Sequence, residues 1–183
     1  MKWVLISLGT LAAIFAGVLL IASTKPPTIA ISRSIVIHAP PQVIFGLIDD
    51  FHNWPLWASQ DREDKTMKRS FLGAAHDMGA VSTWTSKGNA GAGRMTISRS
   101  VPYSQIEVRV DFRAPFVAHN VNEFSLEPAG AATRLTWSMH GTNIFLLKLM
   151  SVFISPESLL GPHFEKGLAV LKSTAENQPA KSR

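Results

Sequence analysis

Reactive side chains are few in this sequence, and their spacing excludes most kinds of catalytic site. Six histidines are present, and none has the spacing to another ligand that a zinc site requires. The acidic stretch at residues 61–65 lacks the alternating oxygen ligands and central glycine of a calcium loop, so we interpret it as a solvated loop. The absence of cysteine excludes disulfides and thiol nucleophiles. We therefore expect no metal ion and no cofactor.

Phosphate recognition is also poorly supported. The glycine-rich stretch GNAGAG at residues 88–93 is followed by the alternating RMTIS rather than by a helix. It cannot present helix amides to a phosphate, so we interpret it as a hairpin turn. The net charge is +5, but the Lys and Arg residues are scattered and form no run that would follow a nucleic-acid backbone. We expect no nucleic-acid partner.

General acid or base catalysis needs a titratable group that faces a water-poor cavity. In HNVNEFSL, alternation places Asn120 and Asn122 on the same face as the apolar Phe124, while the histidine and glutamate of this stretch fall on the other face. An asparagine orients a carbonyl but is a poor base. Thr133 shares the inward face of Leu135 and is placed to donate one hydrogen bond. The predicted interior therefore favours binding over turnover, and we predict no catalytic residue.

The chain begins with a segment that has the length and composition of a membrane span. Residues 3–22 carry no charge, and as a helix they extend about 30 Å, which matches a bilayer's hydrocarbon core. Pro26 and Pro27 end this helix. The length favours a retained anchor, whereas the small residues of IASTK keep a cleaved signal peptide as the alternative. Lysines at both ends leave the orientation undetermined by charge.

We expect a single-pass membrane protein with its globular domain on the extracytoplasmic side. The predicted division is an anchor or signal peptide with a short linker at residues 1–27, one globular domain at residues 28–178 and a polar tail at residues 179–183. The chain without residues 1–27 should fold as a soluble domain, because the strand pattern begins after the prolines.

Short alternating runs after the prolines predict antiparallel strands, in SRSIVIH, TMKRSFLG, AVSTWTSK, GRMTISRSV, QIEVRVDFRA, NEFSLEP and TRLTWSMHG. APPQVIFGLIDDF and FHNWPLWAS predict two short helices between the first two strands. Ser155 and Pro156 are suited to begin a long C-terminal helix, in which apolar residues recur at spacings of four and three. A curved sheet that holds one amphipathic helix is the economical packing of these elements.

The sequence resembles the polyketide cyclase and lipid-transfer superfamily, the SRPBCC or START-like group that includes the birch-pollen allergen. The resemblance rests on SIVIHAPPQVIFGLIDDFHNWPLWAS, GAVSTWTSKGNAGAGRMTI, FSLEPAGAATRLTW and GPHFEKGLAVLKSTAE, in this order, and covers about residues 33–176. It implies an α+β helix-grip fold, with a curved antiparallel sheet around a long C-terminal helix, here preceded by one transmembrane helix. These motifs concern core, turns and helix faces, so the resemblance transfers no catalytic residue.

Several aromatic and small residues have two interpretations in this fold. Trp54 and Trp57 share one helical face, and we interpret them as a wedge that closes one end of the grip, with ligand contact by one ring as the alternative. Trp84 and Trp137 point inward and belong either to the core or to a cavity wall. Gly167 lies on the apolar helix face, where either a bulky residue such as one of these tryptophans packs against its backbone or a ligand occupies the space.

Residues 144–154, IFLLKLMSVFI, are apolar on nearly all sides. A helix of this kind must be covered by protein or by lipid, so it either faces the bilayer over the cavity mouth or packs on the edge of the sheet.

We predict a membrane-tethered binding or transfer module for a lipid or other hydrophobic small molecule. The alternative is a polyketide cyclase or dehydratase, which only the family resemblance implies. The expected partners are the hydrophobic ligand and the membrane. The predicted ligand-binding residues lie on inward faces of strands and helix: Trp84, Met95, Ile97, Val108, Val110, Phe112, Asn120, Asn122, Phe124, Leu135, Trp137, Phe164 and Gly167.

Overall fold

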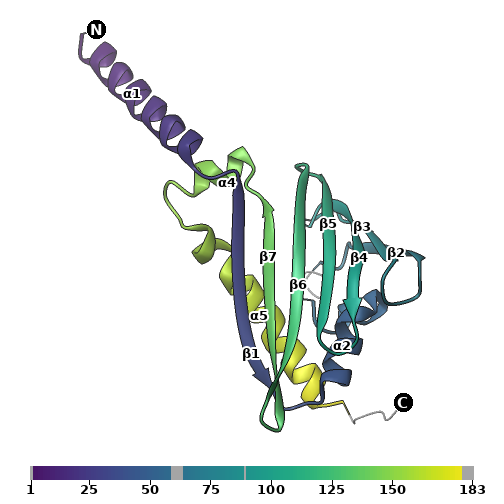
Figure 1. The fold of residues 1–183 in the computed structure, drawn as a ribbon. Helices are drawn as coiled ribbons and strands as arrows, with labels where there is room; N and C mark the ends of the chain where they lie inside the picture. Colours follow the sequence, from purple (N-terminus) through teal and green to yellow (C-terminus); the bar gives the residue numbers. More distant parts are fainter. Residues whose placement is uncertain (1, 59–63, 89, 179–183) are drawn as a thin grey trace.

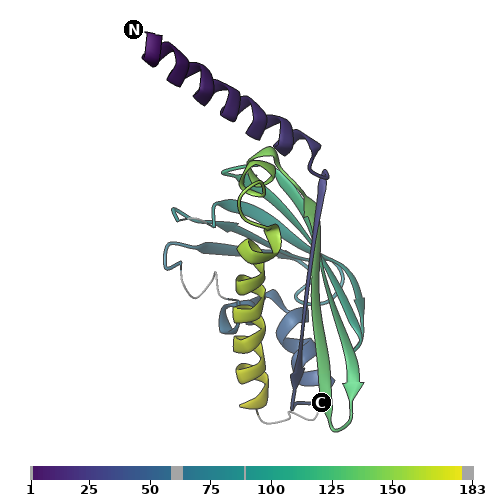
Figure 2. The same cartoon turned by 90° about the vertical axis from the view of Figure 1, so that its left-hand side faces the viewer.

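The computed structural model describes residues 2–58, 64–88 and 90–178. A curved seven-stranded antiparallel sheet holds the long helix α5 (Pro156–Glu176) against its concave face (Figures 1 and 2). This is the predicted α+β helix-grip architecture. Most of the acidic loop predicted at residues 61–65, the asparagine of the predicted glycine-rich turn and the predicted tail at residues 179–183 lie outside the described residues.

The strands predicted from alternation all form, and each is antiparallel to its neighbours. They follow the order β1-β7-β6-β5-β4-β3-β2. Their bounds are β1 Thr28–Ile37, β2 Lys68–Gly73, β3 Ala80–Thr85, β4 Ala92–Val101, β5 Gln105–Ala114, β6 Ala118–Ala129 and β7 Ala132–Thr142. β1 begins earlier than SRSIVIH indicates, because Thr28 already pairs with Thr142 at the end of β7. Bulges between β4 and β5 interrupt the register and add to the curvature.

The predicted helices also form. α2 (Pro41–Asp49) has Pro41 in its first turn, where a missing N–H costs nothing. It leads into the 3-10 helix η1 (Phe51–Leu56). At the start of α5, the Ser155 hydroxyl accepts a hydrogen bond of 3.1 Å from the Ser158 N–H, as expected of an N-cap.

Polar contacts fasten α5 to β1 at the open edge of the sheet. Arg33 forms ion pairs with Glu157 and Glu165 of the helix. The Lys172 ammonium donates to the Val36 carbonyl at 2.6 Å. Because α5 is tied along this edge, its other flank faces the strands farther across the sheet, and α2 contacts its lower half (Figure 2).

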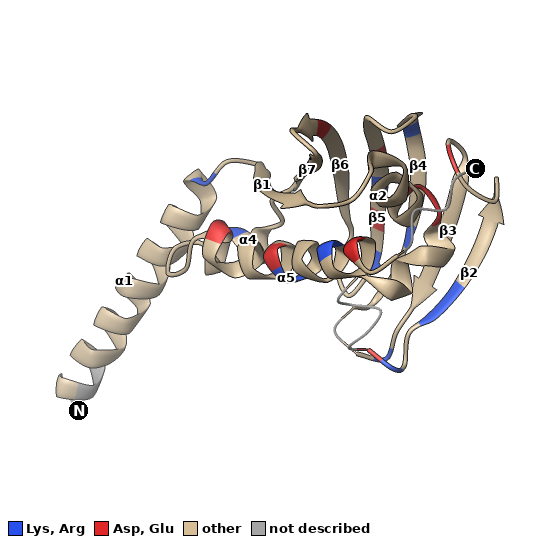
Figure 3. Ribbon diagram, turned by 90° about the horizontal axis from the view of Figure 1, so that it is seen from below, with Lys and Arg blue, Asp and Glu red and all other residues tan. Residues whose placement is uncertain are grey.

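Helix α1 (Lys2–Thr24) projects away from the sheet, and Figure 3 shows no charged residue between its ends. Ile6–Thr24 is long and apolar enough to cross a membrane, and a signal sequence near the N-terminus would meet the same criteria. Most of α1 is exposed, but Ala22 is fully buried where the end of the helix contacts α4 (Phe145–Met150). The end of α1 is thus attached to the apolar segment 144–154, which is expected from the sequence to be covered by protein or by lipid.

Candidate functional site

The wedge of tryptophans closes the grip at η1. The indole N–H of Trp54 donates to the Ile48 carbonyl at 2.8 Å, and that of Trp57 donates to the Leu47 carbonyl at 2.8 Å. Both rings are buried, and both meet the ring of Phe124 edge-on. The indole N–H groups are therefore hydrogen-bonded to α2, and the rings pack against the sheet. This agrees with the interpretation of FHNWPLWAS as a wedge that closes one end of the grip.

A pocket of about 120 Å³ lies between this wedge, α5 and the concave face of the sheet. Its wall is mainly aromatic and methionine-rich, with a few polar groups. The lining residues are Trp54, Trp57, Ala58, Met67, Arg69, Trp84, Met95, Val110, Phe112, Asn120, Asn122, Trp137, Met139, His163 and Phe164. The tryptophans of η1 are thus part of the wall as well as a wedge.

The predicted ligand-binding residues divide into two groups. Those that the structure brings together on the wall are Trp84, Met95, Val110, Phe112, Asn120, Asn122, Trp137 and Phe164. The others are not on the wall: Ile97, Val108, Phe124 and Leu135 are fully buried in the core, and Gly167 lies behind Trp137. Strand parity was correct for the strand residues of this second group, but side chains that point inward fill the core before they reach the pocket.

Trp137 organises the helix side of the wall. Its indole N–H donates to the Asn122 side-chain oxygen at 3.1 Å, and its ring stacks on Phe124 with centroids 5.2 Å apart. The ring of Phe164 lies 4.3 Å away. A Cβ atom on Gly167 would come within 2.9 Å of this indole, so the geometry supports the packing explanation for the glycine.

Arg69 and His163 are functional candidates that the sequence analysis missed. Arg69 lies opposite Trp84 in the β2–β3 register and donates to the buried Ser82 hydroxyl at 2.9 Å. His163 precedes Phe164 on α5. The four-residue spacing from His163 to Gly167 places both on the same side of the helix, and this signal was available in the sequence. The pocket therefore carries a guanidinium and an imidazole in addition to the two predicted amides.

Comparison with known families places this geometry in context. A family model described as "Polyketide cyclase / dehydrase and lipid transport" matches residues 28–176. The chain belongs to this family. No curated protein sequence matches the chain.

Solved structures share the helix-grip fold of this family member at low sequence identity. Protein CV1439 from Chromobacterium violaceum is 16% identical with a TM-score of 0.57, over 84% of this chain and 100% of that chain. A putative uncharacterized protein from Rhizobium leguminosarum is 12% identical with a TM-score of 0.60, over 82% of this chain and 96% of that chain. The di-domain ARO/CYC StfQ from the steffimycin biosynthetic pathway is 9% identical with a TM-score of 0.60, over 81% of this chain and 51% of that chain. These similarities confirm the predicted fold.

Other polar groups of the family domain lie away from the pocket. Thr133, which was expected to donate one hydrogen bond from the inward face of β7, donates to the Ala39 carbonyl at 2.9 Å and joins β7 to the residues before α2. His119 lies on the opposite sheet face, as predicted, and its Nδ1 is 2.7 Å from an Asp111 carboxylate oxygen. Within the described ranges, no group of three or more His, Asp and Glu side chains is placed to hold a metal ion. A second hollow, of about 230 Å³, lies outside the grip beside the β6–β7 turn and the first residues of α2.

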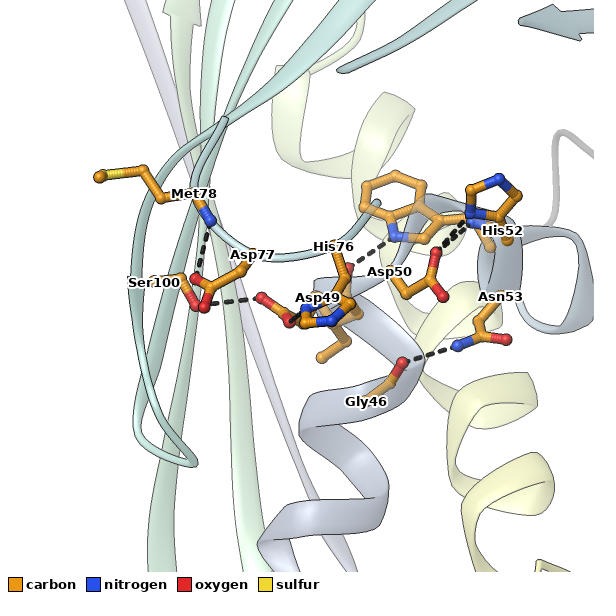
Figure 4. Close-up of polar contacts among 11 residues, drawn as sticks. Gly46, Asp49, Asp50, His52, Asn53, His76, Asp77, Met78 and Ser100 are labelled. Carbon is orange, nitrogen blue, oxygen red and sulfur yellow. Dashed lines mark hydrogen bonds and ion pairs between the residues drawn. The ribbon is translucent and has the colours of Figure 1, made fainter. Parts of the chain in front are cut away.

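Asp49, the most deeply buried carboxylate among the described residues, is also absent from the pocket wall. Figure 4 shows its polar contacts. Asp49 lies at the end of α2, where its Oδ1 accepts a hydrogen bond of 3.0 Å from the Ser100 hydroxyl of β4. His76 Nδ1 is 3.7 Å from the other carboxylate oxygen. Burial raises the pKa of Asp49, and the hydrogen bond from Ser100 opposes that shift. Asp49 therefore attaches α2 to the sheet and is not placed to act on a molecule in the pocket.

Proposed function

We propose that this family member is a membrane-tethered binding or transfer module for a lipid or other hydrophobic small molecule. The observation that carries the proposal is the pocket between α5 and the sheet, whose wall is mostly aromatic rings and methionines with a few fixed polar groups. Such walls hold apolar ligands by burial, while a small number of hydrogen-bonding groups set their orientation. The apolar helix α1 supplies the tether in this proposal.

The size of the pocket limits which part of a ligand it holds. A cavity of roughly 150 Å³ is enough for a benzene molecule. The pocket, at about 120 Å³, is somewhat smaller, so without rearrangement it accommodates a short acyl segment or part of a ring. Met67, Met95 and Met139 are on the wall, and unbranched methionine side chains adapt readily to a larger guest. A long-chain ligand would enter by moving these side chains rather than the tryptophans, which are held by hydrogen bonds.

A cyclase or dehydratase is the second candidate, and His163 is the observation that favours it. An imidazole on the wall of an apolar pocket is a group that can transfer protons, and Arg69 adds a cation that can stabilise an enolate. The binding proposal needs neither group to react. The two candidates share the pocket and differ in whether the bound molecule changes.

The test is mass spectrometry of ligands extracted from the purified full-length chain and from two variants in which an alanine is replaced by phenylalanine. Ala58 is on the pocket wall, so Ala58→Phe fills the pocket. Ala30 is exposed on β1, and Ala30→Phe adds the same side chain outside the grip. Lipid that adheres to α1 will be common to all three proteins. We expect a species that is depleted in Ala58→Phe and retained in Ala30→Phe.

Identical extracts from the three proteins would refute binding in this pocket. The cyclase candidate makes a further prediction for the same extract. It requires a cyclised polyketide product in the wild type, and uncyclised material retained in His163→Gln. Recovery of one unchanged species from both proteins would favour binding alone.

A further inference from the structure

Large apolar side chains are exposed at the end of the domain from which α1 emerges. On α4 and the residues after it, Phe145, Phe153 and Ile154 are exposed, with Phe153 at 75%. Burial on the sheet edge, the other explanation for the apolar segment 144–154, does not account for them. Soluble proteins seldom leave such a cluster in water unless a partner or a membrane covers it.

The connection between β5 and β6 carries a second apolar projection at the same end. Phe116 and Val117 are exposed at its tip, Val117 at 66%. The backbone N–H and carbonyl of His119, just after this tip, both bond the Thr142 hydroxyl at the end of β7. The chain reaches α4 three residues beyond Thr142, so the two projections rise from neighbouring points on the sheet (Figure 1).

The end of α1 fixes the level of these projections relative to a bilayer. Asn143 bonds the carbonyls of Pro26 and Pro27, at 2.9 Å from its side chain and 2.8 Å from its backbone N–H. Ala22, only two residues before α1 ends at Thr24, is buried, and α1 contacts α4. At about 1.5 Å of rise per residue, α4 lies within about one helical turn of the end of the apolar span.

We infer that the segment 144–154 and the tip at residues 115–117 form a membrane-docking face, which seats the domain on the lipid surface beside α1. The occupant is the bilayer, because the face is continuous with the one helix in the described chain that has the length and composition to span it. Basic residues accompany both projections: Lys25 directly follows α1, Lys148 lies on α4 and Arg113 precedes the tip. This combination of apolar tips and cations suits an interface with anionic headgroups. The inference rests on the proposed membrane tether α1, to which it adds a second contact with the membrane, and it does not depend on what the pocket binds.

The absence of cysteine allows a direct test in the full-length chain. Phe153→Cys and Val117→Cys each introduce a single thiol, which is labelled with the environment-sensitive fluorophore NBD. Met78→Cys is the matched control, because Met78 and Val117 are both 66% exposed. Met78 lies in the β2–β3 connection. The β3–β4 turn, at the other end of β3, contains Gly91, which lies beside Ala114 just before the tip, so Met78 is at the end of the sheet away from the proposed face. The proteins are reconstituted in vesicles of phosphatidylcholine and phosphatidylglycerol, with and without a lipid that carries a quencher near the headgroup.

Interfacial elements insert about 5–10 Å into the headgroup region, so the shallow quencher should reach both projections. We expect blue-shifted emission and several-fold stronger quenching at positions 153 and 117 than at position 78. Equal, water-like emission at the three positions would overturn the inference. Blue-shifted emission at 153 and 117 without lipid quenching would also overturn it, because a second protein copy would then be the cover.

Discussion

Replacing Gly167 with alanine tests whether Trp137 is fixed as the structure shows. The added Cβ would lie 2.9 Å from Cζ3 of Trp137, closer than carbon atoms normally approach. The indole cannot move away freely, because its N–H is bonded to Asn122 and its ring lies between Phe124 and Phe164. Relief requires either a shift of α5 from the sheet or a displacement of the ring toward the pocket.

Two effects of known size oppose each other in this variant. Alanine is favoured over glycine in a helix interior by about 1 kcal/mol. Overpacking a close contact costs about 1–3 kcal/mol. The net expectation is a loss of about 1 kcal/mol in the free energy of unfolding, which lowers Tm by about 2–4 °C for a chain of this size.

Gly46→Ala is the matched control for Gly167→Ala. Gly46 is also inside a helix, α2, but a Cβ at this position meets no other atom within 4 Å. Only the helix propensity then acts, so Gly46→Ala should raise Tm by about 2–4 °C. Thermal unfolding of both full-length variants in one detergent, followed by circular dichroism, measures the difference. An equal rise in Tm for both variants would refute the close packing of Trp137 on Gly167.

Three other perturbations have outcomes that follow from the structure. Burial raises the pKa of Asp49 above its value of about 3.9 in an unfolded chain. The folded state therefore loses stability as pH rises from the unfolded-state pKa through the higher folded-state pKa. Asp49→Asn keeps an acceptor for Ser100, so its Tm should exceed that of the wild type at pH 7, and the difference should shrink on acidification; a constant difference would contradict this. Trp57→Ala should cost about 3–5 kcal/mol in urea unfolding, because the ring is fully buried, and a cost below 1 kcal/mol would show that it is not part of the wedge. Residues 28–183 alone should fold, as judged by circular dichroism and sedimentation, and an aggregated product would mean that α1 is needed by the domain.

Periodicity predicted the sheet well, because one face of almost every strand packs on a single core. In β5, Ile106, Val108 and Val110 are buried while Arg109 is exposed, as their alternation indicates. The fold-level resemblance then supplied the arrangement that periodicity lacks, namely which strands are neighbours. The two short helices and the cap of α5 were predictable for a local reason, since proline and serine act within one turn.

The candidate site was less predictable, since a residue of its wall must lie at the level of the pocket along the strand as well as have a side chain that points inward. Val108 and Val110 share a face of β5, yet only Val110 reaches the pocket. Arg69 lies on the edge strand β2, whose side chains are otherwise mostly exposed, so alternation gave no inward direction. Its place became evident only from the pairing of Arg69 with Trp84, which is a property of the register and not of either strand alone.

The double role of the tryptophan wedge determines how the function must be tested. Trp54 and Trp57 hold α2 to η1 through their N–H groups, and their rings also form part of the pocket wall. A variant of either tryptophan that lost ligand would also have lost several kcal/mol of packing, so binding and folding would change together. Ala58 follows Trp57 directly and shares the same wall, but its side chain contributes little to the core. Filling the pocket from Ala58 changes the space available to a ligand while leaving the hydrogen bonds of the wedge in place.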